Sequence, residues 1–113
     1  MKVTEFDGGI VVIAPQGILV EGSATDSFCY ELAACNRPEI KHIVLDLTEV
    51  VHINAAVKEI IANARRSCLQ RGATLTLAGL NKRLIATMVV AHPDLVLNSH
   101  PNSELAVQIL RAY

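Results

Sequence analysis

The 113-residue chain is within the size range of one domain, so we expect a single unit over residues 1–113. Hydrophobic residues make up 51% of it and charged residues 19%, which excludes the polar, highly charged composition of disordered chains. Ten basic residues against eleven acidic ones give a net charge of −1, and no basic stripe interleaves with aromatic residues. This balance argues against nucleic acid or an anionic membrane as a partner.

The cysteines and the apolar runs indicate a cytoplasmic location. Cys29, Cys35 and Cys68 are odd in number and lack paired metal-ligand spacing, so neither a disulfide framework nor a zinc site is expected. Apolar runs such as residues 10–14 are much shorter than the roughly 20 residues of a membrane span. The first residues also lack the apolar core of a signal peptide, so we expect neither export nor a membrane span.

Two strands are predicted at the start of the chain. Residues 10–14 are rich in β-branched side chains and are followed by Pro15 and Gly17, which is typical of a strand that ends in a turn. Residues 2–6 can pair with this strand. The intervening Asp-Gly-Gly, residues 7–9, favours a tight hairpin turn.

A helix and a buried strand are predicted next. Ser23 and Asp26 have the spacing of a capping box, and the apolar residues that follow predict a helix over 23–35. Residues 40–47 place apolar side chains on both faces, as in a central strand covered on each side, with Asp46 near its end.

The second helix has the clearest pattern. Asn54 can cap it and Gly72 can end it. One apolar stripe connects these ends, formed by Val57, Ile60, Ile61, Ala64 and Cys68.

The last third of the chain predicts a strand over 74–78 and a helix capped by Asn81 that ends near residue 90. The pair His92-Pro93 then breaks the helix, residues 95–97 are predicted as a short edge strand, and a final helix runs to Arg111.

The expected order is therefore β-β-α-β-α-β-α-β-α, which defines the α/β class. Strands joined by helices pair in parallel through right-handed crossovers, and the initial hairpin adds one antiparallel strand. The sequence predicts one domain with a mixed sheet of about five strands and about four helices against it.

Sequence motifs for common enzymatic sites are absent. No dinucleotide, phosphate-loop, zinc-protease or nucleophile-elbow pattern occurs. The four histidines, His42, His52, His92 and His100, are not spaced as ligands on one helix face. We therefore expect no enzymatic activity, no cofactor and no metal site.

Asp46 has two interpretations. The phosphate-accepting aspartate of a receiver domain lies at a similar place, at the C-terminal edge of a parallel sheet. A receiver also needs acids after its first strand to hold Mg²⁺, but the residues there, 14–17, include none. The favoured interpretation is that Asp46 orders the following loop by accepting backbone hydrogen bonds.

Residues 48–60 also allow two interpretations. They place the N-terminus of a helix at the C-terminal edge of the sheet, where the helix dipole favours an anion. The local sequence Asn54-Ala55-Ala56-Val57 offers a cap and small apolar side chains without a nucleophile. The favoured interpretation is a regular helix start.

Three segments occur in a distinctive order: IVVIAPQGILV, IVLDLTEVVHIN and RGATLTLAGL, followed by the final strand and helix. Over nearly its whole length the chain thereby resembles the STAS family, the fold shared by bacterial anti-sigma-factor antagonists and the cytoplasmic domains of sulfate transporters. The resemblance implies a STAS-like fold and a protein partner, such as an anti-sigma factor or a kinase-like regulator.

The chain departs from the family at its signature. In the family, the loop before the second helix usually carries an Asp-Ser-x-Gly motif whose Ser is phosphorylated by a partner kinase. Here Asn54 replaces the Asp, Ala55 the Ser and Val57 the Gly, while Val20 replaces an acid in the earlier Gly-x-Leu-Asp element.

The resemblance implies that phosphorylation puts about −2 charge at the interface and ejects the partner. Ala55 has no hydroxyl to accept a phosphate. Thr48 lies elsewhere in the loop, and Ser67 lies twelve residues along the helix, about 18 Å away. We therefore predict no phosphorylation at this site and a domain locked in its partner-competent form.

The expected partner-binding residues surround the start of this helix. Val51, Ala56 and Val57 are expected to supply contact area, and Lys58 and Glu59 to set orientation. The alternative for Val57 is an ordinary core position, because it belongs to the apolar stripe. The complete set is Thr48, Val51, Asn54, Ala55, Ala56, Val57, Lys58 and Glu59.

Another functional class remains open: a structural or regulatory STAS subunit of a larger assembly, either a stress-signalling scaffold or a transport system. Such a subunit contacts other STAS subunits or a constant partner and forms a homo-oligomer. A cleft at the sheet edge that binds a nucleotide or lipid is a third option, without a supporting constellation of residues.

Overall fold

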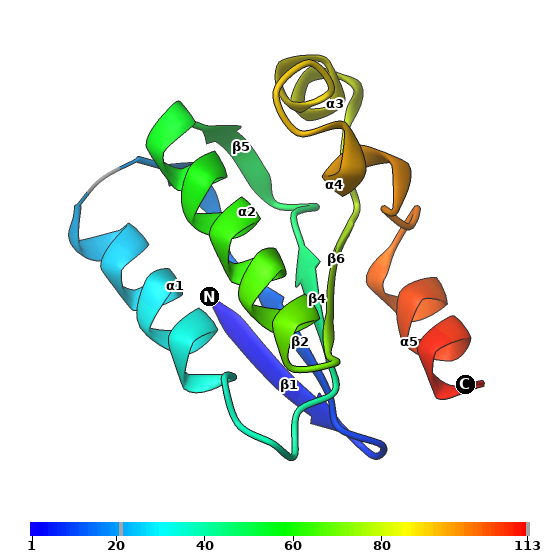
Figure 1. Cartoon of the computed structure of the whole chain (residues 1–113). Helices are drawn as coiled ribbons and strands as arrows, with labels where there is room; N and C mark the ends of the chain where they lie inside the picture. The colour runs from blue at the N-terminus through cyan, green and yellow to red at the C-terminus, as the bar shows by residue number, and fades with distance from the viewer. Residues whose placement is uncertain (21, 113) are drawn as a thin grey trace.

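The computed structural model describes residues 1–20 and 22–112. Four strands form a mixed sheet in the order β1-β2-β4-β6 (Figure 1). β1 (Lys2–Phe6) is antiparallel to β2 (Ile10–Ala14), whereas β4 (His42–Asp46) and β6 (Thr74–Ala78) continue the sheet in parallel. These strands, and the mixed α/β class, are those predicted from the sequence.

The predicted hairpin between β1 and β2 is confirmed. Gly8 and Gly9 have φ angles of +90° and +76°, which residues other than glycine rarely adopt. The Gly9 carbonyl also accepts hydrogen bonds from the backbone N–H groups of Lys41 and His42, at 2.7 and 3.0 Å. The turn therefore fixes the register between β2 and the start of β4.

A small parallel sheet that the sequence did not predict extends beyond the main one. It pairs β3 (Gly17–Leu19) with β5 (Val50–Ile53). The Gly17 N–H donates to Glu49 O at 2.9 Å, and the Asn54 N–H donates to Leu19 O at 3.1 Å. These bonds anchor the segment that leads into the second long helix.

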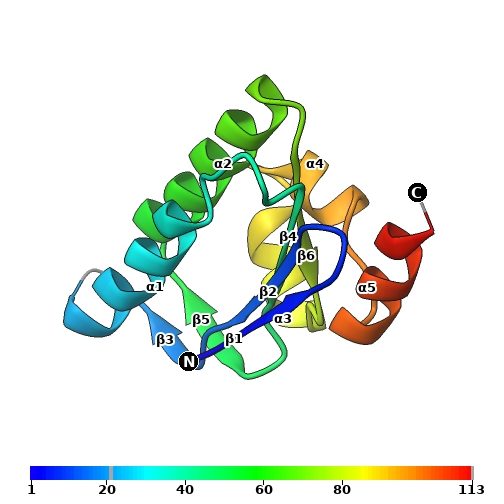
Figure 2. The same ribbon diagram turned by 90° about the horizontal axis from the view of Figure 1, so that it is seen from below.

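Helices cover both faces of the main sheet (Figure 2). α1 (Ser23–Ala34) and α2 (Ala55–Gln70) lie side by side on one face, and α5 (Ser103–Arg111) lies on the other. The larger core lies under α1 and α2, and the smaller core, which includes Val12 and Val44, lies under α5. No helix in the described ranges is long and apolar enough to cross a membrane.

The start of α1 differs from the predicted cap, whereas the end of α2 agrees with the predicted stop. The residue before α1 is Gly22, so the predicted capping box starting at Ser23 does not form the N-cap. Thr25 lies in the first turn instead, with its hydroxyl donating to the Val20 carbonyl. At the end of α2, Gly72 has a φ of +76° and forms the predicted stop.

The strand predicted over residues 95–97 is wrong. Residues Pro93–Leu97 form the short helix α4, which follows α3 (Lys82–Met88). Pro93 occupies the first helical turn, where its missing N–H costs nothing, and Leu95 becomes buried in the core. His100 pairs with β6 instead, through an isolated parallel bridge in which its N–H donates to Leu77 O at 2.9 Å.

Candidate functional site at the start of helix α2

The loop after β4 is held by a short side-chain network. Asp46 Oδ1 accepts the Thr48 backbone N–H at 3.1 Å and the Thr48 hydroxyl at 2.6 Å. Gly79 packs against this turn with a φ of +72°, and a Cβ there would collide with Thr48 Oγ1. The loop-ordering role predicted for Asp46 is thus confirmed, and the Thr48 hydroxyl is already hydrogen-bonded.

Strand β5 is buried at its two ends and exposed at its two middle residues. Val50 and Ile53 are buried, whereas Val51 is 53% exposed. Ile18 on β3 is 58% exposed and lies opposite His52, which is also exposed. An exposed aliphatic surface therefore precedes α2.

Asn54 caps α2 as predicted. Its Oδ1 accepts the Val57 backbone N–H at 3.0 Å, which satisfies one of the donors that a helix start leaves unpaired. The first turn of α2 contains no acidic residue, so no charged side chain of that turn offsets the positive end of the helix dipole.

The first two residues of α2 face solvent. Ala55 and Ala56 are exposed, so both are accessible to a partner. Val57 is fully buried, in contact with the core under α1 and α2. The expectation that Val57 supplies contact area is therefore wrong, and the alternative of a core position is correct.

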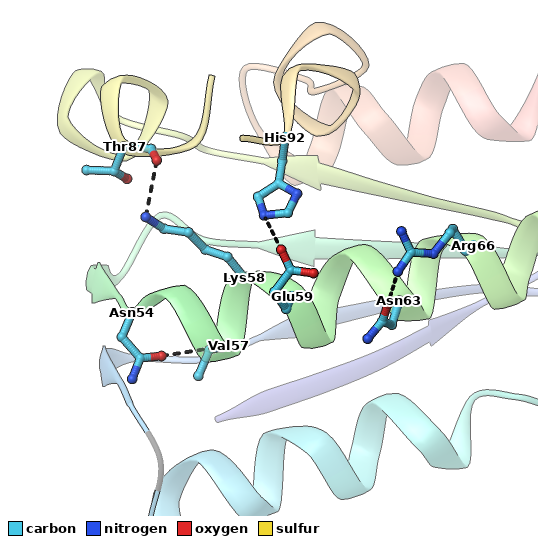
Figure 3. Close-up of polar contacts among 8 residues, drawn as sticks. All are labelled: Asn54, Val57, Lys58, Glu59, Asn63, Arg66, Thr87 and His92. Atoms are coloured by element: carbon cyan, nitrogen blue, oxygen red, sulfur yellow. Dashed lines mark hydrogen bonds and ion pairs between the residues drawn. The ribbon is translucent and has the colours of Figure 1, made fainter. Parts of the chain in front are cut away.

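Lys58 and Glu59 are both engaged within the chain (Figure 3). Lys58 Nζ donates to the carbonyl oxygen of Thr87, at the end of α3, at 3.2 Å. Glu59 Oε1 lies 3.3 Å from His92 Nε2, at the start of α4. These contacts connect the first turns of α2 to the α3–α4 segment.

The sequence prediction missed Ile18, Thr87 and His92 at this site. Ile18 lies on a three-residue strand, too short to give a periodic pattern. Thr87 and His92 reach α2 through the packing of α3 and α4, and the sequence contains no signal for these contacts.

The titratable groups with shifted pKa values lie outside this site. Burial raises the pKa of Cys29, Cys35 and Cys68, and burial lowers the pKa of His42. Within residues 1–20 and 22–112, no cluster of three or more His, Cys, Asp or Glu side chains is arranged to hold a metal ion.

A mixed sheet with two helices on one face, one on the other and a small exposed surface before α2 defines an α/β domain of the STAS type. The chain belongs to the STAS domain family, whose model matches residues 1–106. No curated protein matches the chain.

Solved structures of STAS domains share this fold. The anti-sigma factor antagonist SpoIIAA in its unphosphorylated form is 10% identical over 99% of this chain and 98% of that chain, with a TM-score of 0.78. The STAS domain of the SulP transporter from Vibrio cholerae is 18% identical over 96% of this chain and 89% of that chain, with a TM-score of 0.70.

Part of an anion transporter is also similar to this chain. Murine Solute Carrier 26 family member A9, an anion transporter in the inward-facing state, is 12% identical over 93% of this chain, with a TM-score of 0.70. This chain covers 18% of that transporter. At these identities the comparisons establish a shared fold.

Proposed function

We propose that this protein is a non-enzymatic, cytoplasmic protein-interaction module of the anti-sigma-factor-antagonist kind, and that no phosphorylation switch operates at position 55. Its partner is a protein regulator that binds the β5–α2 surface, defined as Thr48, Val51, Asn54, Ala55, Ala56, Lys58 and Glu59. The observation that carries this proposal is Ala55, an exposed methyl group at the first position of α2.

The packing around Ala55 supports a preformed contact surface. Asn54 caps the helix, and Thr48 is bonded to Asp46, so the loop before α2 is ordered before any partner binds. The exposed side chain of Val51 offers apolar contact area. The small side chains of Ala55 and Ala56 let a partner approach the helix backbone closely. A preordered surface loses less conformational entropy on binding.

The absence of a hydroxyl at position 55 supports constitutive binding. In a switched domain, a phosphate here places about −2 charge in the interface and disfavours the complex by repulsion and desolvation. Ala55 cannot acquire that charge, and the Thr48 hydroxyl is held by Asp46. Lys58 and Glu59, which belong to the surface, also contact Thr87 at the end of α3 and His92 at the start of α4.

The test is affinity capture from the source cell with wild-type protein and Ala55→Asp as baits. Ala33→Asp is the matched control, because it adds the same charge to an exposed alanine near the end of α1. We expect wild type and Ala33→Asp to retain one common protein and Ala55→Asp to lose it. Equal retention by all three baits contradicts the proposal.

The similarity to transporter STAS domains favours a second candidate, a constant subunit of a larger assembly. Size-exclusion chromatography with light scattering distinguishes the two candidates. A regulator of the first kind is a monomer or weak dimer, whereas an assembly subunit self-associates and gains stability with concentration.

A further inference from the structure

A second feature, which borders the β5–α2 surface at Glu59, is a small hollow between α2 and the segment that begins α4. Its volume is about 230 Å³, which at roughly 30 Å³ per water holds a tetrahedral oxyanion with several waters. The residues that line it are Ala62, Arg65, Arg66, Ala91, His92, Pro93, Asp94 and Leu95.

Helix α2 supplies one wall of this hollow. Glu59 and Arg66 extend toward the α4 side of α2 (Figure 3). Ala62 also lines the hollow, and its spacing of three and four residues from Glu59 and Arg66 puts its small side chain on the same helix face. Arg66 Nη2 donates to Asn63 Oδ1, which holds its guanidinium along the helix.

The opposite wall contacts α2 through His92. His92 Nε2 lies 3.3 Å from Glu59 Oε1, and the His92 side chain is 12% exposed. This contact joins the segment 91–95 to α2 at one end of the hollow.

The charges of the hollow are suited to a small anion. Arg65 and Arg66 contribute two positive charges, and Arg65 has no hydrogen-bond or ion-pair partner among the described residues. A guanidinium presents several N–H donors in a plane, a geometry that matches two oxygens of a phosphate. Asp94 is the acid in the lining, and Glu59 contacts the lining residue His92.

We propose that this hollow binds inorganic phosphate. Arg65 and Arg66 donate hydrogen bonds to its unprotonated oxygens. The carboxylate of Asp94 accepts a hydrogen bond from the oxygen that carries the proton. A carboxylate repels an oxyanion that has no proton to donate, so Asp94 sets the specificity of the site.

This assignment predicts an order among anions. Inorganic phosphate keeps at least one proton at neutral pH, whereas sulfate keeps none. The phosphate group of phosphoserine loses its second proton with a pKa of about 6 and is mostly unprotonated at pH 7. Inorganic phosphate is therefore expected to bind more tightly than either sulfate or phosphoserine.

The test is an NMR titration of the full chain with inorganic phosphate, sulfate and phosphoserine at pH 7 and matched ionic strength. We expect saturable amide shifts in residues 62–66 and 91–95, with phosphate about tenfold tighter than sulfate or phosphoserine. Arg65→Gln weakens phosphate binding about tenfold. The matched control Arg83→Gln, on the exposed surface of α3, leaves it unchanged.

Asp94→Asn provides the second variant, and its amide spectrum shows whether it is folded. It removes the preference for phosphate over sulfate if the carboxylate accepts the proton-bearing oxygen. The proposal is overturned if the shifts do not saturate, if Arg65→Gln and Arg83→Gln behave alike, or if folded Asp94→Asn keeps the preference. Tighter binding of phosphoserine than of inorganic phosphate also overturns it.

Discussion

A negative charge at position 55 is predicted to stabilise the fold relative to a neutral side chain of the same size, even though we expect it to weaken partner binding. Ala55→Asp places a carboxylate at the first residue of α2, whose first turn contains no acid. A negative charge there gains about 0.3–1 kcal/mol from the helix dipole at low ionic strength. The positive charge of Lys58, three residues further on, also attracts this carboxylate and adds to the stabilisation.

The matched control for this prediction is Ala55→Asn, which has nearly the same size and no charge. The free energy of unfolding of Ala55→Asp is expected to exceed that of Ala55→Asn by about 0.3–1 kcal/mol. For a domain of this length, the melting temperature then rises by about 1–4 °C. In 1 M salt, with a Debye length of about 3 Å, the difference shrinks by more than half.

Urea denaturation of both variants at low and high salt measures this difference. The reasoning is refuted if Ala55→Asp is less stable than Ala55→Asn at low salt, or if salt leaves the difference unchanged. The expected result shows that the charge itself does not destabilise the fold, so a partner retained by Ala55→Asn and lost by Ala55→Asp is lost through the charge and not through unfolding.

Three further predictions concern the stability of the fold. Gly79→Ala should lower the free energy of unfolding by about 2 kcal/mol or more, because it combines a positive φ with a collision at Thr48. In Gly8→Ala the new Cβ meets open space, so this control should lose only about 1–2 kcal/mol through backbone strain. Urea denaturation measures both losses. Asn54→Ala should cost about 1 kcal/mol by loss of the helix cap, and Asn54→Asp should retain most of that stability in the same assay. Burial lowers the pKa of His42, so the unfolded chain takes up a proton first as pH falls below about 6.5, and stability is lost in that window. Thermal melts between pH 5 and 7 should show a flatter pH dependence for His42→Gln; an unchanged slope contradicts this assignment.

Most of the fold could be predicted because its strands and helices have distinct apolar periods. The stripe on α2, with Asn54 before it and Gly72 after it, combines periodicity, cap and stop in one segment. β2 and β4 read as apolar runs because helices cover both faces of the sheet. In each case the local signal and the tertiary environment favour the same structure.

The elements that could not be predicted are those in which tertiary contacts decide. β3 and β5 have three and four residues, and each depends on pairing with the other. Residues 95–97, Leu-Val-Leu, have the composition of a strand, but Pro93 favours a helical turn at the start of α4, and the packing of Leu95 against the core then favours the short helix.

The candidate site was predictable where the backbone determines it. The cap at Asn54 and the exposed position of Ala55 follow from the start of an amphipathic helix. The stripe also identifies Val57 as a core position, which the structure bears out. The bonds of Lys58 and Glu59 to α3 and α4 were not predictable, because they join residues about 30 positions apart.

The fold requires little of position 55, so a STAS domain can carry either serine or alanine there without a change of structure. Asn54 supplies the cap, Val57 supplies the core contact and Thr48 is held by Asp46, so Ala55 contributes neither a hydrogen bond to the cap nor a buried side chain. Replacing a serine there with alanine removes the hydroxyl that a kinase needs and leaves these contacts intact. Conversely, Ala55→Ser should fold with nearly unchanged stability and restore a phosphate acceptor. The test incubates Ala55→Ser and wild-type protein with a kinase partner recovered from the source cell and detects phosphate by mass spectrometry. Phosphorylation of Ala55→Ser alone shows that the single hydroxyl is the missing part of the switch. A kinase partner that leaves Ala55→Ser unmodified shows that more than the hydroxyl has been lost.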